Sequence, residues 1–165
     1  MLKLFFALTA ICFGVCPTGN TYTFPNEETE VGGLQGCTQI KTVILHADVT
    51  AIKDDAFKGC TALTTINLPE GLLTIGNSAF AGCTSLENIT LPLNLTTIGE
   101  HAFEGTALQS ITFQENVTTI GAYAFNECQD LKLRGSFPEK LTTIGDYAFY
   151  NCTGFGSDSS YYTLS

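Results

Sequence analysis

The residues of this chain best suited to chemistry are its seven cysteines, because thiols can form disulfides, bind metals or act as nucleophiles. Their spacing is regular. Cys37, Cys60 and Cys83 are 23 residues apart, and Cys128 and Cys152 hold the same place in a repeated pattern. Side chains that recur with a repeat stack in parallel, whereas a disulfide needs converging Cβ atoms and zinc needs a tetrahedron of ligands. We therefore predict buried free thiols that pack as small apolar side chains.

Catalytic motifs are the next feature to test. His46 and His101 are the only histidines, and neither is placed by the pattern beside a nucleophile. The sequence has no Gly-rich phosphate loop, no His-Glu-x-x-His and no Gly-x-Ser-x-Gly motif. We expect no enzymatic activity, no metal ion and no cofactor.

The element that must position all of these side chains is a repeat. Ile-Gly-x-x-Ala-Phe recurs with steps of 23, 23, 22 and 24 residues between its phenylalanines, Phe57, Phe80, Phe103, Phe125 and Phe149. A period in this range is typical of a solenoid of stacked coils. Stacking places like residues over like, so these phenylalanines are predicted to form a column inside. Such arrays present extended surfaces for binding.

Each unit divides into a strand and a turn. Ile66 and Leu68 are two residues apart and point to one face of a short strand, while Thr65 and Asn67 point to the other. Pro69 has no N–H to donate and is expected to end that strand.

A second, shorter apolar segment follows, with Leu72 and Ile75. Gly76 allows a tight turn where a Cβ would be costly. The stretch from Gly76 to Cys83 is too short for a stable helix, so it predicts one helical or 3₁₀ turn.

Two copies depart from the regular spacing. The copy after Phe103 is one residue short and lacks the cysteine. The copy after Leu131 is one residue long, and Arg134-Gly135 indicates a bulge that redirects the strand. Any surface patch that differs from the regular array is expected in these two copies.

The two ends of the chain predict its division into segments, and the net charge bears on the kind of partner. Lys3 and the apolar run after it predict a signal peptide over residues 1–14, followed by an N-terminal cap (15–36), an array of about five repeats (37–155) and a C-terminal tail (156–165). Cys16 is either unpaired or joined to Cys37, and as the first mature residue it would permit a lipid anchor. Glu27, Glu28 and Glu30 indicate a solvated cap. The net charge of −9 argues against nucleic acid binding.

The unit Cys-x-x-Leu-x-x-Ile-x-Leu-Pro-x-x-Leu-x-x-Ile-Gly-x-x-Ala-Phe-x-Gly resembles the BspA-like leucine-rich repeats of bacterial and protist surface proteins. The resemblance covers residues 37–155 and implies a leucine-rich-repeat solenoid that is mostly β, with one parallel strand per coil in a right-handed curved array. It also implies attachment to host or matrix proteins, without fixed binding residues. The surface it indicates is the outward side of the strands, which carries Thr42, Thr65, Asn67, Asn88, Thr90, Ser110 and Thr112.

Our leading hypothesis is a monomeric, secreted or cell-surface module, without a transmembrane helix, that binds an extracellular or cell-surface protein through this strand side. The alternative is a structural or truncated fragment of a larger surface adhesin, with no partner of its own. A third hypothesis is ice or mineral binding by threonine rows, which Ala51 and Leu73 interrupt. The rows are Thr96-Thr97, Thr118-Thr119 and Thr142-Thr143.

Overall fold

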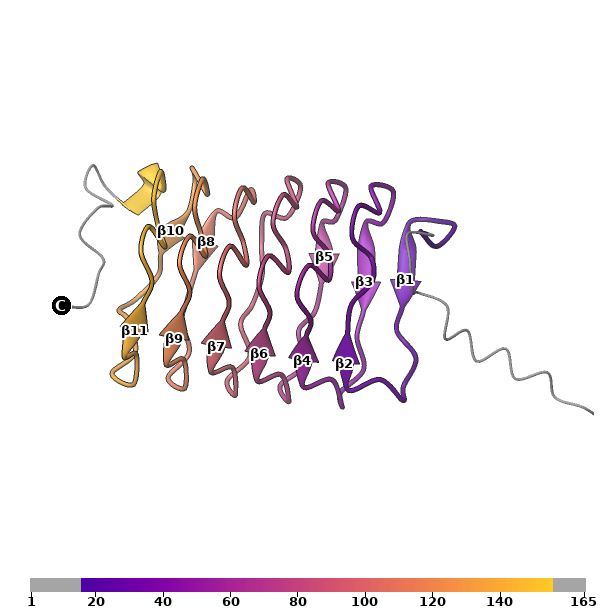
Figure 1. The fold of residues 1–165 in the computed structure, drawn as a ribbon, viewed down its shortest axis with the longest axis horizontal. Helices are drawn as coiled ribbons and strands as arrows, with labels where there is room; N and C mark the ends of the chain where they lie inside the picture. The colour runs from indigo at the N-terminus through magenta and orange to yellow at the C-terminus, as the bar shows by residue number, and fades with distance from the viewer. Residues whose placement is uncertain (1–15, 156–165) are drawn as a thin grey trace, which may run out of the picture.

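A computed structural model describes residues 16–155, so the expected signal peptide and C-terminal tail lie outside the described residues. The chain winds as a parallel β-solenoid of about six turns, with its coils stacked in sequence order from the N-terminal to the C-terminal end (Figure 1). The solenoid fold is therefore confirmed. Residues 16–36, expected to form a cap, contribute a strand to each side of the solenoid and so continue its sheets.

One side of the solenoid is a continuous six-stranded parallel sheet in the order β11-β9-β7-β6-β4-β2. Each strand is two residues long and ends on Val or Ile, and in four of the six strands that residue follows Thr, so β-branched residues favour the extended backbone. In register, Ile98 lies between Ile75 and Ile120, so one apolar residue per coil points inward. The strands are β2 (Glu30–Val31), β4 (Ala51–Ile52), β6 (Thr74–Ile75), β7 (Thr97–Ile98), β9 (Thr119–Ile120) and β11 (Thr143–Ile144).

The other side carries the strands that the Leu-x-x-Ile-x-Leu motif predicts, but there the sheet is broken. A three-stranded sheet, β1-β3-β5, is separated from a pair, β10-β8, by residues 87–91, which form no strand. The more regular sheet is thus the one built from the segment expected to be secondary. The strands of the broken side are β1 (Thr21–Thr23), β3 (Thr42–Ile44), β5 (Thr65–Ile66), β8 (Ser110–Ile111) and β10 (Lys132–Leu133).

The core between the two sides is a stack of phenylalanine rings, as predicted. The rings of Phe57, Phe80, Phe103, Phe125 and Phe149 follow one another at centroid distances of 5.1, 5.1, 5.2 and 5.3 Å, each nearly parallel to the next. All five side chains are at most 1% exposed. The N-terminal end of the stack is closed by Phe24, which meets Phe57 edge-on.

The turns between the two sides differ from the prediction of a helical or 3₁₀ turn. They are separate turns with hydrogen bonds from residue i+3 to residue i, such as Ala56 N–H to Lys53 O and Lys58 N–H to Asp55 O. Between them the backbone is left-handed, at Asp55 (φ 55°) and Gly59 (φ 70°), and this conformation interrupts a helix. Within residues 16–155 the structure has one 3₁₀ helix, η1 (Thr153–Phe155).

The cysteine predictions are confirmed in their main point. Cys60, Cys83, Cys128 and Cys152 are buried free thiols, and each donates a hydrogen bond to a backbone carbonyl of the preceding coil. Of the two possibilities for Cys16, the structure has the disulfide with Cys37, at a Cα–Cα distance of 5.3 Å.

The short repeat needs a correction, because the cysteine position there is filled rather than missing. Thr106 is 4% exposed and its Oγ1 lies 3.2 Å from the Sγ of Cys128, so it stands in the same column with a hydroxyl in place of the thiol. The missing residue therefore falls between Thr106 and Leu108. The column tolerates the exchange because both side chains are small and can donate to a backbone carbonyl, as Thr106 does to Phe103.

We expect these thiols to be inert in the folded protein. Burial raises the pKa of Cys83 and of Cys152 to about 12, and that of Cys128 to about 11, so the reactive thiolate is scarce at neutral pH. Since the folded pKa values lie above the unfolded value of 9.0, their contribution to stability is complete below pH 9 and falls as the pH rises toward 12. Labelling with a thiol reagent, mapped by mass spectrometry, should modify these four residues only after denaturation. Rapid labelling of native protein at pH 8 would contradict the expectation.

Candidate functional site

The surface indicated by the sequence is formed by the outward side chains of the broken side of the solenoid. We call this surface the strand face and define it by Thr42, Thr65, Asn67, Asn88, Thr90, Ser110 and Thr112. The structure hollows it in two places. The first hollow, of about 330 Å³, is lined by residues 64–68 and 88–90, and the second, of about 230 Å³, by residues 88–91 with Ser110, Thr112 and Gln114.

The two hollows share Asn88, Ile89 and Thr90, so they form one depression that crosses three coils. Six of the seven indicated residues line it. Thr42 lines neither of these two hollows and lies one strand further toward the N-terminus, on β3, which pairs in register with β5. The indicated site is thus brought together by the fold, apart from its N-terminal member.

The depression coincides with the break in the sheet. Within the described chain no backbone hydrogen bond joins residues 65–67 to residues 88–90, and the only backbone bond between residues 87–91 and a neighbouring coil runs from Gln109 N–H to Glu87 O. The side chains of Asn67, Asn88 and Thr90 also make no hydrogen bond to any other residue of the described range 16–155. Asn88 and Asn67 are poor strand formers, which fits the loss of pairing here. Peptide and side-chain groups at the break are therefore free to bind a ligand.

The threonine rows on the opposite, continuous sheet contrast with this arrangement. Thr96, Thr118 and Thr142 each donate their hydroxyl to a backbone carbonyl of the preceding coil. Their hydrogen-bonding groups are engaged in holding coils together, so these three hydroxyls are not donors to an outside surface such as ice.

A third hollow was not indicated by our residue list. It has a volume of about 460 Å³ and lies at the C-terminal end of the strand face, where β8 and β10 pair and η1 is adjacent (Figure 1). The signal that could have found it is the irregular copy after Leu131, where a patch different from the array was expected. Its lining residues are Gln109, Gln129, Asp130, Lys132, Arg134, Thr153 and Gly154.

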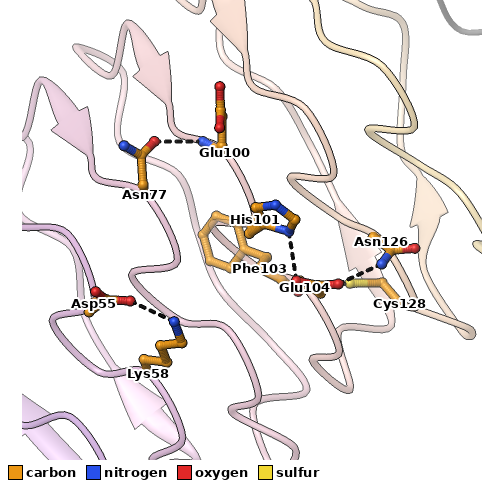
Figure 2. Close-up of polar contacts among 9 residues, drawn as sticks. All are labelled: Asp55, Lys58, Asn77, Glu100, His101, Phe103, Glu104, Asn126 and Cys128. Atoms are coloured by element: carbon orange, nitrogen blue, oxygen red, sulfur yellow. Dashed lines mark hydrogen bonds and ion pairs between the residues drawn. The ribbon is translucent and has the colours of Figure 1, made fainter.

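A polar network outside the strand face involves one of the two histidines (Figure 2). His101 Nδ1 lies 2.7 Å from Glu104 Oε2, and Asn126 donates to Glu104 Oε1 at 2.6 Å. The His101 ring also stacks on that of Tyr123 at 5.0 Å. The side-chain carbonyl oxygen of Asn126, Oδ1, is buried and has no hydrogen-bond partner within the described residues.

The network does not assemble a nucleophile with its base. Cys128 is drawn near it in Figure 2, but the Cys128 thiol donates to Phe103 O at 3.0 Å, and its pKa is raised by burial. His101 Nδ1 is bonded to Glu104 instead. Nucleophilic catalysis requires the nucleophile and base to share a hydrogen bond, which these residues do not.

The same turns carry short polar links that tie or order neighbouring coils. Asn77 accepts a hydrogen bond from Glu100 N–H across a coil boundary at 2.8 Å, and Lys58 pairs with Asp55 within its own turn at 2.9 Å (Figure 2). Residues 16–155 contain no group of three or more His, Cys, Asp or Glu side chains that could hold a metal ion. No helix in that part of the chain is long and apolar enough to cross a membrane.

The repeat is also found in a known protein family. A profile of the BspA type leucine rich repeat region matches residues 8–132 and 133–159, in six copies. No curated protein matches the chain significantly.

Solved structures are similar in both sequence and fold. A leucine-rich repeat protein of Bacteroides ovatus is 32% identical with a TM-score of 0.74, and the match covers 81% of this chain and 38% of the Bacteroides protein. A leucine rich repeat protein of T. pallidum is 30% identical with a TM-score of 0.76, and the match covers 82% of this chain and 67% of that protein. A leucine rich cell surface protein of Faecalibacterium prausnitzii is 25% identical with a TM-score of 0.56, over 81% of this chain and 52% of that one. The chain thus spans well under half of the Bacteroides protein.

Proposed function

Because this chain belongs to the BspA type leucine rich repeat family, a family of non-enzymatic repeat arrays, we propose that it is a binding module that recognises another protein through its strand face. The proposal includes secretion or display at the cell surface, and action as a monomer. The residues that carry it are Asn67, Asn88, Thr90, Ser110 and Thr112, with Thr65 at the edge of the depression.

The observation that supports the proposal most is the difference between the two sides of the solenoid. On the continuous sheet, the hydroxyls of Thr96, Thr118 and Thr142 donate hydrogen bonds to backbone carbonyls of the preceding coils. On the strand face, Thr65 shares a hydrogen bond with Thr64, but five other side chains have no hydrogen-bond partner within residues 16–155 and surround a break in the backbone pairing: Asn67, Asn88, Thr90, Ser110 and Thr112. Hydrogen-bonding groups left free in a hollow give a partner specific contacts, since a mismatched partner would leave them unpaired.

The proposed location is supported by the relatives. One is a leucine rich cell surface protein, and another solved structure with 26% identity, a TM-score of 0.64 and coverage of 76% of this chain and 32% of its own is the pneumococcal vaccine antigen PcpA. The apolar segment after Lys3, which has the pattern of a signal peptide, also supports export.

The test is a triple substitution in the depression, Asn67→Glu, Thr90→Glu and Thr112→Glu. Binding to the protein captured from an array of extracellular-matrix and cell-surface proteins should weaken by about 100-fold or more, because bulk and charge fill the hollows. Surface plasmon resonance measures the affinity, and circular dichroism checks that the melting temperature moves by only a few degrees, since all three side chains are exposed.

The matched control places three glutamates at exposed positions off the strand face, at Leu73, Leu93 and Thr143. It should bind like the original chain. Equal affinity in the strand-face variant would show that the wrong surface has been chosen. A folded chain that binds no protein of the array would favour the alternative, a structural array without a partner of its own.

A further inference from the structure

The third hollow differs from the rest of the strand face in its charge. Lys132 and Arg134 are exposed and line it together, and Arg134 is the single arginine of a chain whose net charge is −9. The depression formed by the first two hollows has no charged lining residue at all. A pair of cations, with Asp130 beside it, therefore lies at the C-terminal end of a strand face whose central depression is lined by uncharged residues.

Neither cation is neutralised by the protein. In the described chain the lysines with polar side-chain partners are Lys53 with Glu30, Lys58 with Asp55, and Lys140 with Asn116. Among residues 16–155, no ion pair or side-chain hydrogen bond involves Lys132 or Arg134.

The acidic residues around the pair leave it free. Glu87, two coils away from the pair, accepts a hydrogen bond from the Gln109 amide at 3.1 Å, so its carboxylate is held by Gln109. Asp130 lines the same hollow but pairs with neither cation. The two positive groups are thus available to an anion from outside.

The register of the strands puts this pair in line with the strand face. Lys132 lies opposite Ser110 and Leu133 opposite Ile111, and Arg134 N–H donates to Ile111 O at 2.8 Å. Lys132 and Arg134 therefore flank the inward Leu133 on the outward side, in the same rows as Ser110 and Thr112. The extra residue of this copy follows near Gly135, where φ is +90°. A ligand extended across the coils from the depression would reach both cations.

We propose that Lys132 and Arg134 form an anion subsite at the C-terminal end of the strand face, which binds the side-chain carboxylates of an acidic peptide segment of the partner. This inference rests on the proposed function and names the chemistry of the partner. The guanidinium of Arg134 can hold a carboxylate with two parallel hydrogen bonds, and the Lys132 ammonium adds a second positive charge.

The surroundings favour a peptide over a sulfated polysaccharide. A long polyanion requires a row of cations, whereas this surface offers two, with Asp130 beside them and a net negative chain behind. A peptide with one or two carboxylates places its charge on the pair. Its uncharged backbone then meets the free amide and hydroxyl groups of the depression.

The test is a titration of the isotope-labelled protein, followed by nuclear magnetic resonance, with the peptide acetyl-Ser-Glu-Ser-Glu-Ser-amide. Backbone resonances of Gln109, Lys132, Arg134 and Thr153 should shift on titration, and binding should weaken as salt is added. The affinity for the same peptide with glutamine in place of glutamate should be lower by about tenfold or more. The variant Lys132→Gln/Arg134→Gln should lose about as much, while the charge-matched control Lys53→Gln/Lys140→Gln, which also removes two positive charges, should leave the affinity unchanged.

Several results would overturn the inference: equal binding of the glutamine peptide, no shift at the hollow, or tight binding of a sulfated heparin tetrasaccharide at these residues in place of the peptide. The proposed function is judged separately, on the captured partner protein. If the strand-face variant abolishes that binding and the Lys132/Arg134 variant does not alter it, the subsite is wrong and the proposed function stands. If the strand-face variant has no effect, the proposed function itself fails, whatever the peptide does.

Discussion

Replacing Phe103 with alanine is expected to lower the free energy of unfolding by about 3–5 kcal/mol. The ring is fully buried and stacked between Phe80 and Phe125 at 5.1 and 5.2 Å, so its removal leaves a cavity in the middle of the column. The neighbouring rings cannot close this cavity, because each is held in its own coil by the paired strands. In a solenoid each coil is stabilised mainly by its two neighbours, so a central defect weakens both halves of the array.

Chemical denaturation followed by circular dichroism measures this effect. The control is Leu93→Ala, which truncates a side chain that is 48% exposed and is expected to cost within about 0.5 kcal/mol. Phe149→Ala, at the end of the column, should cost less than Phe103→Ala because, within the described residues, one ring of the column stacks on Phe149 and two stack on Phe103. A loss below about 1 kcal/mol at Phe103 would contradict the view that the column is the core.

Replacing Gly121 with alanine is expected to cost roughly 3 kcal/mol or more, which is large for a single methyl group. A Cβ on Gly121 would lie 2.5 Å from the backbone nitrogen of Glu100 and 2.6 Å from the carbonyl carbon of Gly99. Both are backbone atoms of the preceding coil and cannot move aside. The coils would have to separate at this point, and the hydrogen bond from Gly121 N–H to Ile98 O, of 2.8 Å, would be strained.

The same denaturation experiment checks this prediction, with Gly32→Ala as the control. There the new Cβ would approach side-chain atoms of Lys53 and Ala56 at 3.2 and 3.6 Å, and the expected cost is below about 1 kcal/mol. Unchanged stability of Gly121→Ala would mean that the coils tolerate wider spacing than the structure shows. If the Gly121→Ala variant folds with wider spacing between coils, the backbone N–H of residue 121 should be less protected from hydrogen exchange than in the original chain.

The glycines after each isoleucine were expected to matter, but the structure requires them for a different physical reason. From the sequence, Gly76 was expected to allow a tight turn. In the structure its φ is not in the left-handed region, and the left-handed turn positions are taken by residues such as Asp55, Ser78 and Gly82. Gly76 is needed because a Cβ there would lie 2.6 Å from Asp54 N in the coil before it. Only the stacking distance between coils reveals this requirement.

The candidate site was predictable in part for a similar reason. Alternation along a strand places Asn67 and Thr65 outward, and the repeat carries the same assignment to Asn88, Thr90 and Thr112. That reasoning treats every coil alike, so it does not show that pairing stops at residues 87–91 or that Thr42 lies outside the hollows. Hydrogen bonds between coils depend on shifts of a fraction of an ångström, which residue types alone do not encode.

The sequence by itself determined the periodic features of this protein: the solenoid, the phenylalanine column, the free thiols and the outward side of the strands. A repeat forces equivalent residues into equivalent places, so one unit predicts the others. The tertiary structure decided everything that breaks the repeat. It placed Thr106 in the cysteine column, joined Cys16 to Cys37, and set Lys132 opposite Ser110 so that Arg134 reaches the strand face. These are contacts between different coils, and their register follows from how an irregular copy packs on a regular one.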